Sequence, residues 1–441
     1  MELLTFKGGI HPDDGKSLSK SDKIKTLLPG KELVFPLSQH IGAPAAPVVA
    51  VGDKVLAGQI IAEASGFISA NVISSVSGTV KAIEKRLMVS GDKVESIIIE
   101  NDNEYSTIPD FGIHRDYTSL SKEEIRSIVK EAGIVGLGGA GFPTHVKLTP
   151  KDDNKIEYIL VNGAECEPYL TSDYREMLEE PEKIVEGLKV VKRLFENAKA
   201  LIVIEDNKPE AIEKIREVIK PEDGIEVKVL KTKYPQGSER QLIGVATGRK
   251  INAGQLPADA GCLVDNVDTI VSIYNAVCKR IPLIRRIITV TGDAVESPGN
   301  FSVRIGTNYT ELLEAAGGYK KEPEKVISGG PMMGTALFTI DVPVVKNSSA
   351  LLCLTKDEVA KYEPTQCIRC GKCVSVCPCR LVPQKMYEYA IHSDHEGYEK
   401  MNGMECYECR CCSYICPAKI RLTQAFKETR RSIMKERSAK K

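Results

Sequence analysis

The chain has 441 residues, of which 42% are hydrophobic and 27% charged, and its 60 basic residues balance 60 acidic ones. This length is too great for one hydrophobic core and predicts about three or four domains. The balanced charge gives no bulk reason to expect a nucleic-acid partner. The N-terminus lacks the apolar segment of a signal peptide, and no apolar run approaches the roughly 18 residues of a membrane span. We therefore expect a cytosolic protein with no membrane span of its own.

Residues 1–30 form a Gly-, Pro- and Lys-rich leader, and residues 31–110 are predicted to form a β domain. Between Val48 and Glu84, short β-rich runs alternate with Gly-Asp and Ser-Gly turns. This pattern resembles the barrel-sandwich fold of lipoyl and biotinyl carriers. Such carriers need a modifiable lysine at a hairpin tip, where residues 67–72 (FISANV) contain none. We expect the barrel-sandwich hybrid fold as a scaffold without carrier chemistry.

Residues 118–285 are predicted to form an α/β domain. An amphipathic helix is expected over Ser119–Val135, with Ser121 and Glu124 as a capping box. Strands and helices then alternate as strand Ile156–Val161, helix Glu182–Phe195, strand Ala200–Ile204, helix Pro209–Ile219 and strand Ile225–Lys231. This alternation implies a parallel sheet with right-handed crossovers.

A glycine-rich loop follows the first predicted helix. Residues 136–144 (GLGGAGFPT) formally contain G-x-G-x-x-G, but they follow a helix and not a strand, so this is no Rossmann fingerprint. Their backbone N–H groups can still approach an anion closely, and Lys147 lies near enough to neutralise a phosphate. From this motif alone, a structural loop without a ligand is the alternative.

Polar clusters follow two of the predicted strands. Residues 162–168 (NGAECEP) come after the first strand, and residues 234–239 (YPQGSE) come after the third. Ligands bind beyond the carboxyl ends of strands in open α/β sheets, so both clusters should meet at one edge. Glu165 and Glu167 could alternatively be ordinary surface carboxylates. Polar clusters at strand ends beside a glycine loop favour a pocket.

Residues 286–350 are predicted to form a small β-grasp module that resembles a soluble-ligand-binding domain. It would consist of strand Ile287–Thr291, Gly/Pro turns, strand Asn300–Arg304 and helix Thr310–Ala316. A docking role suits this module.

Two cysteine runs of identical spacing, C-x-x-C-x-x-C-x-x-x-C-P, lie in the last predicted domain, residues 355–441. In paired runs of this kind, three cysteines hold one [4Fe–4S] cluster and the fourth ligates the other cluster. One cluster is therefore assigned to Cys367, Cys370, Cys373 and Cys416. The second is assigned to Cys406, Cys409, Cys412 and Cys377. Two zinc sites are the alternative. Tetrahedral zinc needs only four thiolates per site, and neither the proline after the last cysteine nor the repetition of the whole pattern is required for it. The chain is thus predicted to move electrons through a two-cluster ferredoxin-like α domain.

The remaining cysteines are expected to be small buried hydrophobes: Cys166, Cys262, Cys278, Cys353, Cys379 and Cys411. Cys379 and Cys411 lie inside the cluster loops. A basic tail ends the chain, with Lys427, Arg430, Arg431, Lys435, Arg437, Lys440 and Lys441. This tail fits contact with an acidic subunit or anionic lipid, and a solvated helix end is the alternative.

With these motifs in hand, the chain resembles the C subunits of Rnf complexes, which are membrane-bound ferredoxin:NAD oxidoreductases. The resemblance covers nearly the whole chain, including residues 8–12 (GGIHP), 132–145 (AGIVGLGGAGFPTH), 330–334 (GPMMG) and both cysteine runs. The middle is similar to the flavin-binding subunit of respiratory complex I, which carries FMN and oxidises NADH. The resemblance departs at three positions, because Leu137 replaces an arginine, Ala164 an aspartate and Ser238 an acid.

The resemblance to complex I implies a role for each matching position. The phosphate side of FMN would be held by Gly136, Gly138, Gly139, Gly141 and Lys147. The isoalloxazine and ribityl chain would be lined by Asn162, Glu165, Tyr234, Gly237, Glu239, Asn266 and Thr269. Glu167 and Phe142 would lie near the nicotinamide nucleotide. No residue is predicted to be catalytic in itself.

The implied electron path runs between NAD(H), FMN, two [4Fe–4S] clusters and the membrane subunits, because flavin converts a hydride into single electrons. The implied partners are the membrane-embedded and iron–sulfur subunits of an ion-translocating complex. The chain itself would sit peripherally on the cytoplasmic face of the cell membrane. Two alternatives stay open: a soluble flavin/iron–sulfur reductase such as a cobalamin reductase, and a non-catalytic electron-relay and docking subunit.

Overall fold

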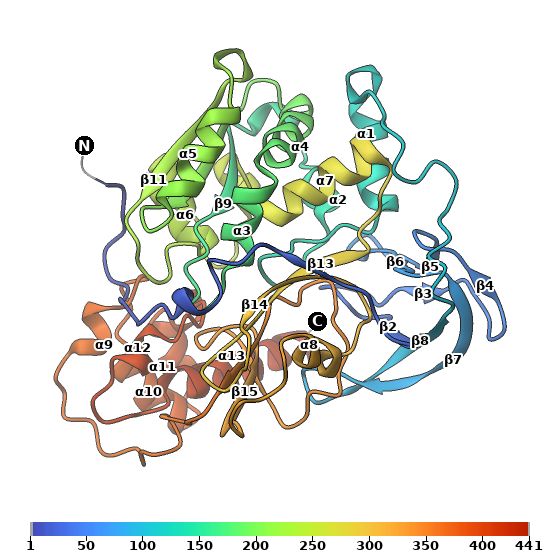
Figure 1. Cartoon of the computed structure of the whole chain (residues 1–441). Coiled ribbons are helices and arrows are strands. Elements are labelled where there is room, and N and C mark those ends of the chain that lie inside the picture. The colour runs from blue at the N-terminus through green and yellow to red at the C-terminus, as the bar shows by residue number, and fades with distance from the viewer. Residues whose placement is uncertain (1–2, 440–441) are drawn as a thin grey trace.

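The computed structural model describes residues 3–439, whose strands form four sheets (Figure 1). The α/β part lies above, the barrel-sandwich sheets lie at the right, and the cysteine-rich helices lie below (Figure 1). The N-terminal segment runs between the α/β part and the cysteine-rich part. None of the helices in the described residues combines the length and apolar composition of a membrane span.

The β domain packs a four-stranded sheet, ordered β2-β8-β7-β4, near a three-stranded one, ordered β3-β5-β6. Its strands are β2 (Glu32–Pro36), β3 (Ala46–Pro47), β4 (Lys54–Val55), β5 (Ile60–Glu63), β6 (Val72–Ile73), β7 (Gly78–Leu87) and β8 (Lys93–Asn101). Leu33, Phe35 and Ile97 are fully buried between them. Phe67 in the predicted hairpin tip, which has no lysine, is 74% exposed, so an apolar side chain lies at the surface there.

The α/β domain has the predicted parallel sheet, with strand order β11-β10-β9-β12. Its strands are β9 (Tyr158–Gly163), β10 (Lys199–Glu205), β11 (Ile225–Leu230) and β12 (Cys262–Asn266). Its helices are α1 (Lys122–Glu131), α2 (Thr144–Lys147), α3 (Ser172–Glu179), α4 (Pro181–Leu194), α5 (Pro209–Val218), α6 (Glu239–Thr247) and α7 (Val267–Lys279). Sequence analysis missed β12, because five residues that include Asp265 make too short an apolar run to stand out.

The first helix of this domain is shorter than predicted. The Ser121–Glu124 capping box is present and begins α1, as expected. The helix ends at Glu131, because Gly133 adopts a left-handed φ of 65° that a helix cannot continue through. The chain is therefore free to form the glycine loop from residue 136 onward.

The predicted β-grasp module is part of a six-stranded mixed sheet, ordered β1-β14-β13-β17-β15-β16. Its elements are β13 (Arg285–Thr291), β14 (Gly299–Arg304), α8 (Tyr309–Ala315), β15 (Lys325–Ser328), β16 (Thr335–Leu337) and β17 (Ala350–Leu354). The sixth strand, β1 (Lys25–Leu27), comes from the leader and pairs in parallel with β14. The leader is therefore integrated into the fold, which composition alone did not indicate.

The cysteine-rich part is helical, with α9 (Lys372–Ser375), α10 (Pro383–Ile391), α11 (His395–Lys400), α12 (Cys411–Tyr414) and α13 (Leu422–Ala439). Tyr398 and Phe426 are fully buried in its core, with ring centroids 6.1 Å apart. Two arginines of the basic tail, Arg430 and Arg437, pair with Glu408 and Glu399 of the same part. Lys440 and Lys441 of that tail lie outside the described residues.

Candidate flavin and iron–sulfur site

The two predicted polar clusters meet at the carboxyl edge of the parallel sheet. Asn162 at the end of β9 donates its side-chain N–H to the Gly237 carbonyl at 2.9 Å, and its Oδ1 accepts the Ala164 N–H at 3.2 Å. A Cβ on Gly237 would lie 3.3 Å from the Cys166 sulfur, so the two loops touch backbone to side chain. The sheet thus brings together segments about seventy residues apart, as topology predicted.

The glycine loop closes onto the same edge. The Gly136 N–H donates to the Phe142 carbonyl at 2.8 Å, and the Leu137 N–H donates to the Thr269 hydroxyl at 3.0 Å. A Cβ on Gly138 would lie 2.9 Å from the Asn266 side chain, whereas Gly139 has no atom within 4 Å of such a Cβ. The loop is therefore packed on one side and open on the other, as a cradle for an anionic group requires.

Lys147 faces this cradle from α2 but is already bound to the protein. Its Nζ donates to the Val264 carbonyl at 2.8 Å and lies 3.4 Å from Asp265 Oδ1. Burial raises the pKa of Asp265 and of Glu239, and the Lys147 cation lowers both. The predicted phosphate-side lysine thus also compensates two buried carboxyls.

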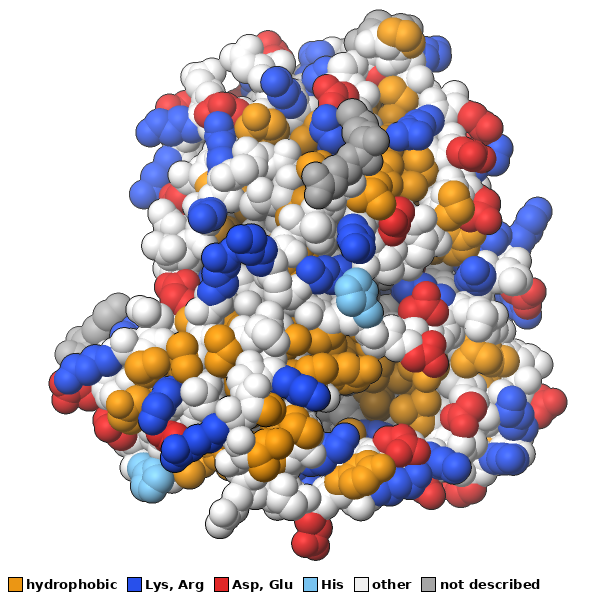
Figure 2. Space-filling model, turned by 90° about the vertical axis from the view of Figure 1, so that its left-hand side faces the viewer, with side chains coloured by type: hydrophobic (Ala, Val, Ile, Leu, Met, Phe, Trp, Pro, Cys, Tyr) orange, Lys and Arg blue, Asp and Glu red, His pale blue; other side chains and the backbone are white. Residues whose placement is uncertain are grey.

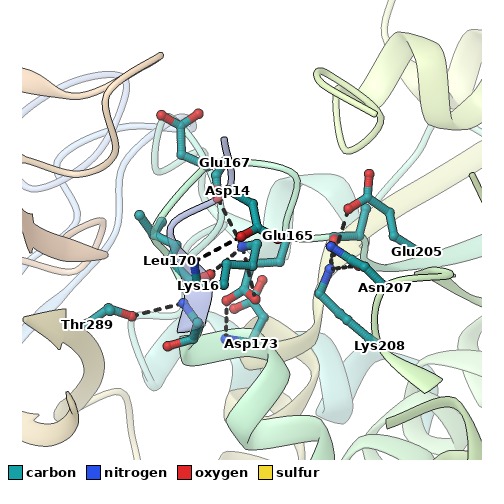
Figure 3. A network of polar contacts seen from close by, with 12 residues as sticks. Asp14, Lys16, Glu165, Glu167, Leu170, Asp173, Glu205, Asn207, Lys208 and Thr289 are labelled. Carbon is teal, nitrogen blue, oxygen red and sulfur yellow. Dashed lines mark hydrogen bonds and ion pairs between the residues drawn. The ribbon is translucent and has the colours of Figure 1, made fainter. Parts of the chain in front are cut away.

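A buried network of charges holds the loop after β9 (Figure 3). Lys16 of the leader donates to the Glu167 carbonyl at 3.0 Å and to the Leu170 carbonyl, and its Nζ lies 3.7 Å from Glu165 Oε2. Glu165 Oε1 accepts the Asp173 N–H at 2.7 Å. Burial, followed by the Glu165 carboxyl, raises the pKa of Asp173 to about 7.

A second lysine supports the same loop from β10's carboxyl end (Figure 3). Lys208 is 2% exposed, donates to the Ala164 carbonyl at 2.6 Å, and lies 3.4 Å from Glu205 Oε2. Sequence analysis predicted neither Lys16 nor Lys208, nor the buried Asp173. The only local signal for Lys16 was its place four residues after the GGIHP motif.

Glu167 is directed toward the β-grasp module. Its Oε1 accepts the N–H groups of Met332 and Met333 at 2.7 and 3.0 Å. A Cβ on Gly330 would lie 2.3 Å from the Glu167 side chain, so the GPMMG motif needs its glycine for this approach. Two motifs that sequence analysis treated separately are therefore one contact, and the predicted nicotinamide-side carboxylate is held by backbone N–H groups.

The edge offers polar atoms that suit a flavin nucleotide. Within residues 3–439, buried polar atoms without a hydrogen-bond partner include Glu165 Oε2, Asp265 Oδ2 and both amide atoms of Gln236. A buried polar group that stays unpaired costs about 1–3 kcal/mol. The ribityl hydroxyls and the isoalloxazine edge of FMN carry matching donors and acceptors, so these residues fit FMN.

Four cysteines of the predicted second cluster line one cavity. The cavity is lined by Cys377, Cys406, Cys409 and Cys412, together with Cys379, Cys411 and apolar side chains. Burial raises the pKa of the Cys412 thiol to about 12, and the neighbouring thiols of Cys406, Cys409 and Cys377 act in the same direction. Four thiols around one cavity fit a [4Fe–4S] cluster, whose cubane is held by four separate thiolates.

The predicted first cluster is nearer the surface. Cys367 and Cys370 are exposed, while Cys373 and Cys416 are half-buried; burial raises the pKa of the Cys373 thiol, and the Cys416 thiol acts in the same direction. Among the described residues, no three His, Cys, Asp or Glu side chains converge as they would around a single metal ion.

The other cysteines divide into two groups. Cys262, Cys278, Cys353 and Cys411 are buried, as predicted for small apolar side chains. Cys166 and Cys379 are only half-buried, and the Cys166 sulfur accepts the Gly237 N–H at 3.2 Å within the candidate flavin site.

Comparison with known families agrees with this architecture. A family model of the Nuo51 FMN-binding domain matches residues 129–275, one of the RnfC barrel sandwich hybrid domain matches residues 4–104, and one of the SLBB domain matches residues 287–336. The fold and the site therefore define a multidomain α/β protein with a Nuo51-type flavin-binding domain between a barrel-sandwich domain and an SLBB module.

Relatives from two organisms show to which family within this class the chain belongs. The chain is 44% identical to the C subunit of the Na(+)-translocating ferredoxin:NAD(+) oxidoreductase complex of Acetobacterium woodii, over 98% of both chains. It is 45% identical to the C subunit of the proton-translocating ferredoxin:NAD(+) oxidoreductase complex of Clostridium ljungdahlii, over 87% of this chain and 84% of that one. The chain belongs to this family, the C subunits of ferredoxin:NAD(+) oxidoreductase (Rnf) complexes.

A solved structure shares the fold at lower similarity. An H2-reduced NAD+-reducing [NiFe]-hydrogenase matches with a TM-score of 0.51 and 18% identity, over 71% of this chain and 61% of that chain. The chain therefore spans less than two thirds of that hydrogenase chain.

Proposed function

We propose that this chain is the electron-transfer subunit of a ferredoxin:NAD oxidoreductase complex, in which it exchanges electrons with NAD(H). Its family membership supports this reaction, since both relatives are named as subunits of such a complex and the chain matches each of them over most of its length. The observation that carries the proposal is the shared apolar contact between the flavin-site loop and the cysteine loops. Tyr234 of the former and Cys411 of the latter are both buried in it.

FMN at the sheet edge would supply the conversion between a hydride and single electrons. The chain's own residues then have separate tasks. The glycine loop and Lys147 bind the phosphate side, while Asn162, Glu239 and the Glu165 loop orient the ring. The β-grasp contact through Glu167 covers the site from one side.

The cysteine assignments and the domain limits given above complete the proposal: residues 31–110, 118–285, 286–350 and 355–441, with two [4Fe–4S] clusters in the last. We further propose that the chain works as a peripheral subunit on the cytoplasmic face of the cell membrane, bound to the membrane-embedded and iron–sulfur subunits of its complex.

Anaerobic reconstitution with iron, sulfide and FMN, followed by addition of NADH, tests the proposal. The expected result is bleaching of flavin absorbance followed by loss of cluster absorbance. Bound FMN that NADH leaves oxidised would instead support a relay subunit fed from elsewhere. Failure of FMN to bind at all would overturn the flavin assignment.

A further inference from the structure

The two cysteine runs are not equivalent in their surroundings. In the first run, Cys367 and Cys370 are exposed, Ile368 between them is 68% exposed, and Cys373 is half-buried. In the second run, Cys406 and Cys409 are half-buried and Cys412 is 8% exposed, and Cys411 beside it is fully buried. Helix α9, which lies within the first run and contains Cys373, is at the left side of Figure 1, the side turned to the viewer in Figure 2. That face carries hydrophobic side chains interspersed with Lys and Arg (Figure 2).

The second run contacts the flavin-site loop that follows β11. The Cys411 thiol lies 4.0 Å from the Tyr234 carbonyl oxygen, and both residues belong to one buried apolar cluster with Ile10 and Met332. Cys409 and Cys166, one from each side, pack against this cluster. The contact therefore joins the two candidate cofactor sites through buried side chains.

The start of α6 makes a second contact with the same run. Arg240 donates to the Glu405 carbonyl at 3.2 Å and pairs with its carboxylate at 3.1 Å. The buried hydroxyl of Tyr407 faces Ser238 without a well-formed hydrogen bond. Gln236, which lies between Tyr234 and Arg240 in the sequence, is fully buried. Neither atom of its side-chain amide has a hydrogen-bond partner among the described residues.

The leader fixes this junction from outside. Ile10 and Tyr234 exchange backbone hydrogen bonds at 2.9 and 3.0 Å, and the Gly9 N–H donates to the Val376 carbonyl at 2.8 Å. Gly8 has a left-handed φ of 88°, and a Cβ there would lie 2.8 Å from the Cys377 carbonyl oxygen. The GGIHP motif is therefore a clamp that binds both the flavin-site loop and the segment around Cys377.

From this asymmetry we infer that the cluster of Cys406, Cys409, Cys412 and Cys377 exchanges electrons directly with the flavin, and that the cluster of Cys367, Cys370, Cys373 and Cys416 is the outer one. Gly8 is a positioning residue that holds the inner cluster against the flavin-site loop. The inference rests on the proposed function for its flavin, and it adds the order of the two clusters and a role for the leader. Each step moves one electron: the donor centre is oxidised by one and the acceptor cluster is reduced by one.

The first test uses the full chain loaded with both clusters and needs neither NADH nor FMN, so it is independent of the proposed function. The substitutions Cys370→Ser and Cys409→Ser assign the two reduced-cluster EPR signals, because a serine ligand alters the signal of its own cluster. A water-soluble paramagnetic relaxation agent is then added to the wild-type protein reduced with dithionite. We expect the signal assigned by Cys370→Ser to relax faster. A stronger effect on the signal assigned by Cys409→Ser would overturn the order.

The second test removes one cluster at a time from flavin-loaded protein. Without the outer cluster (Cys367→Ala with Cys370→Ala), NADH should still reduce the remaining cluster rapidly through the flavin. Without the inner cluster (Cys409→Ala with Cys412→Ala), reduction of the remaining cluster should be severalfold slower, although NADH still bleaches the flavin. Equal rates in the two variants, or the opposite ranking, would contradict the inference. Flavin that NADH does not bleach in the wild type would instead refute the proposed function.

The clamp has its own matched control. Gly8→Ala should shift the midpoint potential of the inner cluster alone in a mediated redox titration, since it pushes on the Cys377 segment. Gly52→Ala introduces the same strain at a left-handed φ of 97°, but its Cβ would meet no atom within 4 Å, so it should shift neither potential. A shift confined to the outer cluster in Gly8→Ala, or no shift in that variant, would remove the positioning role.

Discussion

Replacing Lys16 by methionine should loosen the loop after β9, because this lysine is the main support of that loop from the leader. The substitution keeps most of the buried chain volume but removes two hydrogen bonds to the Glu167 and Leu170 carbonyls and the ion pair with Glu165. Both side chains of the ion pair are nearly inaccessible, at 9% and 3% exposure. Removing one partner of a buried pair costs about 3–5 kcal/mol.

This cost should appear as local opening. At 1.4 kcal/mol per factor of ten, even about 3 kcal/mol makes the loop's amide hydrogens exchange about a hundredfold faster. Hydrogen-exchange mass spectrometry of peptides covering residues 164–174 measures this directly, and the Asp173 N–H that donates to Glu165 is the most direct reporter. Since Lys16 also lowers the pKa of Glu165, the substitution should raise that pKa further. The control is Lys20→Met, which changes an exposed side chain of the same leader.

Unchanged exchange over residues 164–174 in Lys16→Met would refute the reasoning, because the buried cation would then contribute nothing to holding the loop. Equal acceleration in Lys16→Met and Lys20→Met would refute it as well, since the effect would come from the leader in general.

Three further outcomes are expected. Lys147→Ala should lower the FMN content after reconstitution and leave the iron content unchanged, with the exposed Lys151→Ala as control; normal FMN content would sink the phosphate-side assignment. Because the pKa of Asp173 is raised from 3.8 to about 7, its neutral form stabilises the fold fully below about 3.8, and this contribution is lost as pH rises to about 7. The Asp173→Asn variant should therefore gain thermal stability relative to wild type between those pH values, and a pH-independent difference would contradict this. Phe426→Ala should cost about 3–5 kcal/mol in the cysteine-rich core and expose α13 to limited proteolysis, whereas Met434→Ala on the exposed face of α13 should not.

Local patterns were enough wherever the deciding interactions lie close together in the chain. The capping box of α1 joins residues three apart. The strands and helices around β9, β10 and β11 are indicated by the periodic spacing of apolar residues over short stretches of sequence. Parallel topology then places the Asn162 and Tyr234 clusters at one edge, since the carboxyl ends of parallel strands coincide. The sharing of Cys377 with the second cysteine run was likewise predicted from spacing and stays a prediction, and in the structure those four cysteines line one cavity together with Cys379 and Cys411.

Tertiary structure alone decided the contacts between distant segments. Lys16 reaches Glu167 across 151 positions, and Glu167 reaches Met332 across 165, separations at which no periodicity or spacing carries a signal. The leader had the composition of a linker, yet it forms β1 and clamps the flavin-site loop to the segment around Cys377. The cysteine spacing by itself predicted two clusters of equal standing. Only packing, which buries Cys411 against Tyr234 and leaves Cys367 exposed, distinguishes the two cysteine runs, because burial depends on neighbours that the folded chain brings together.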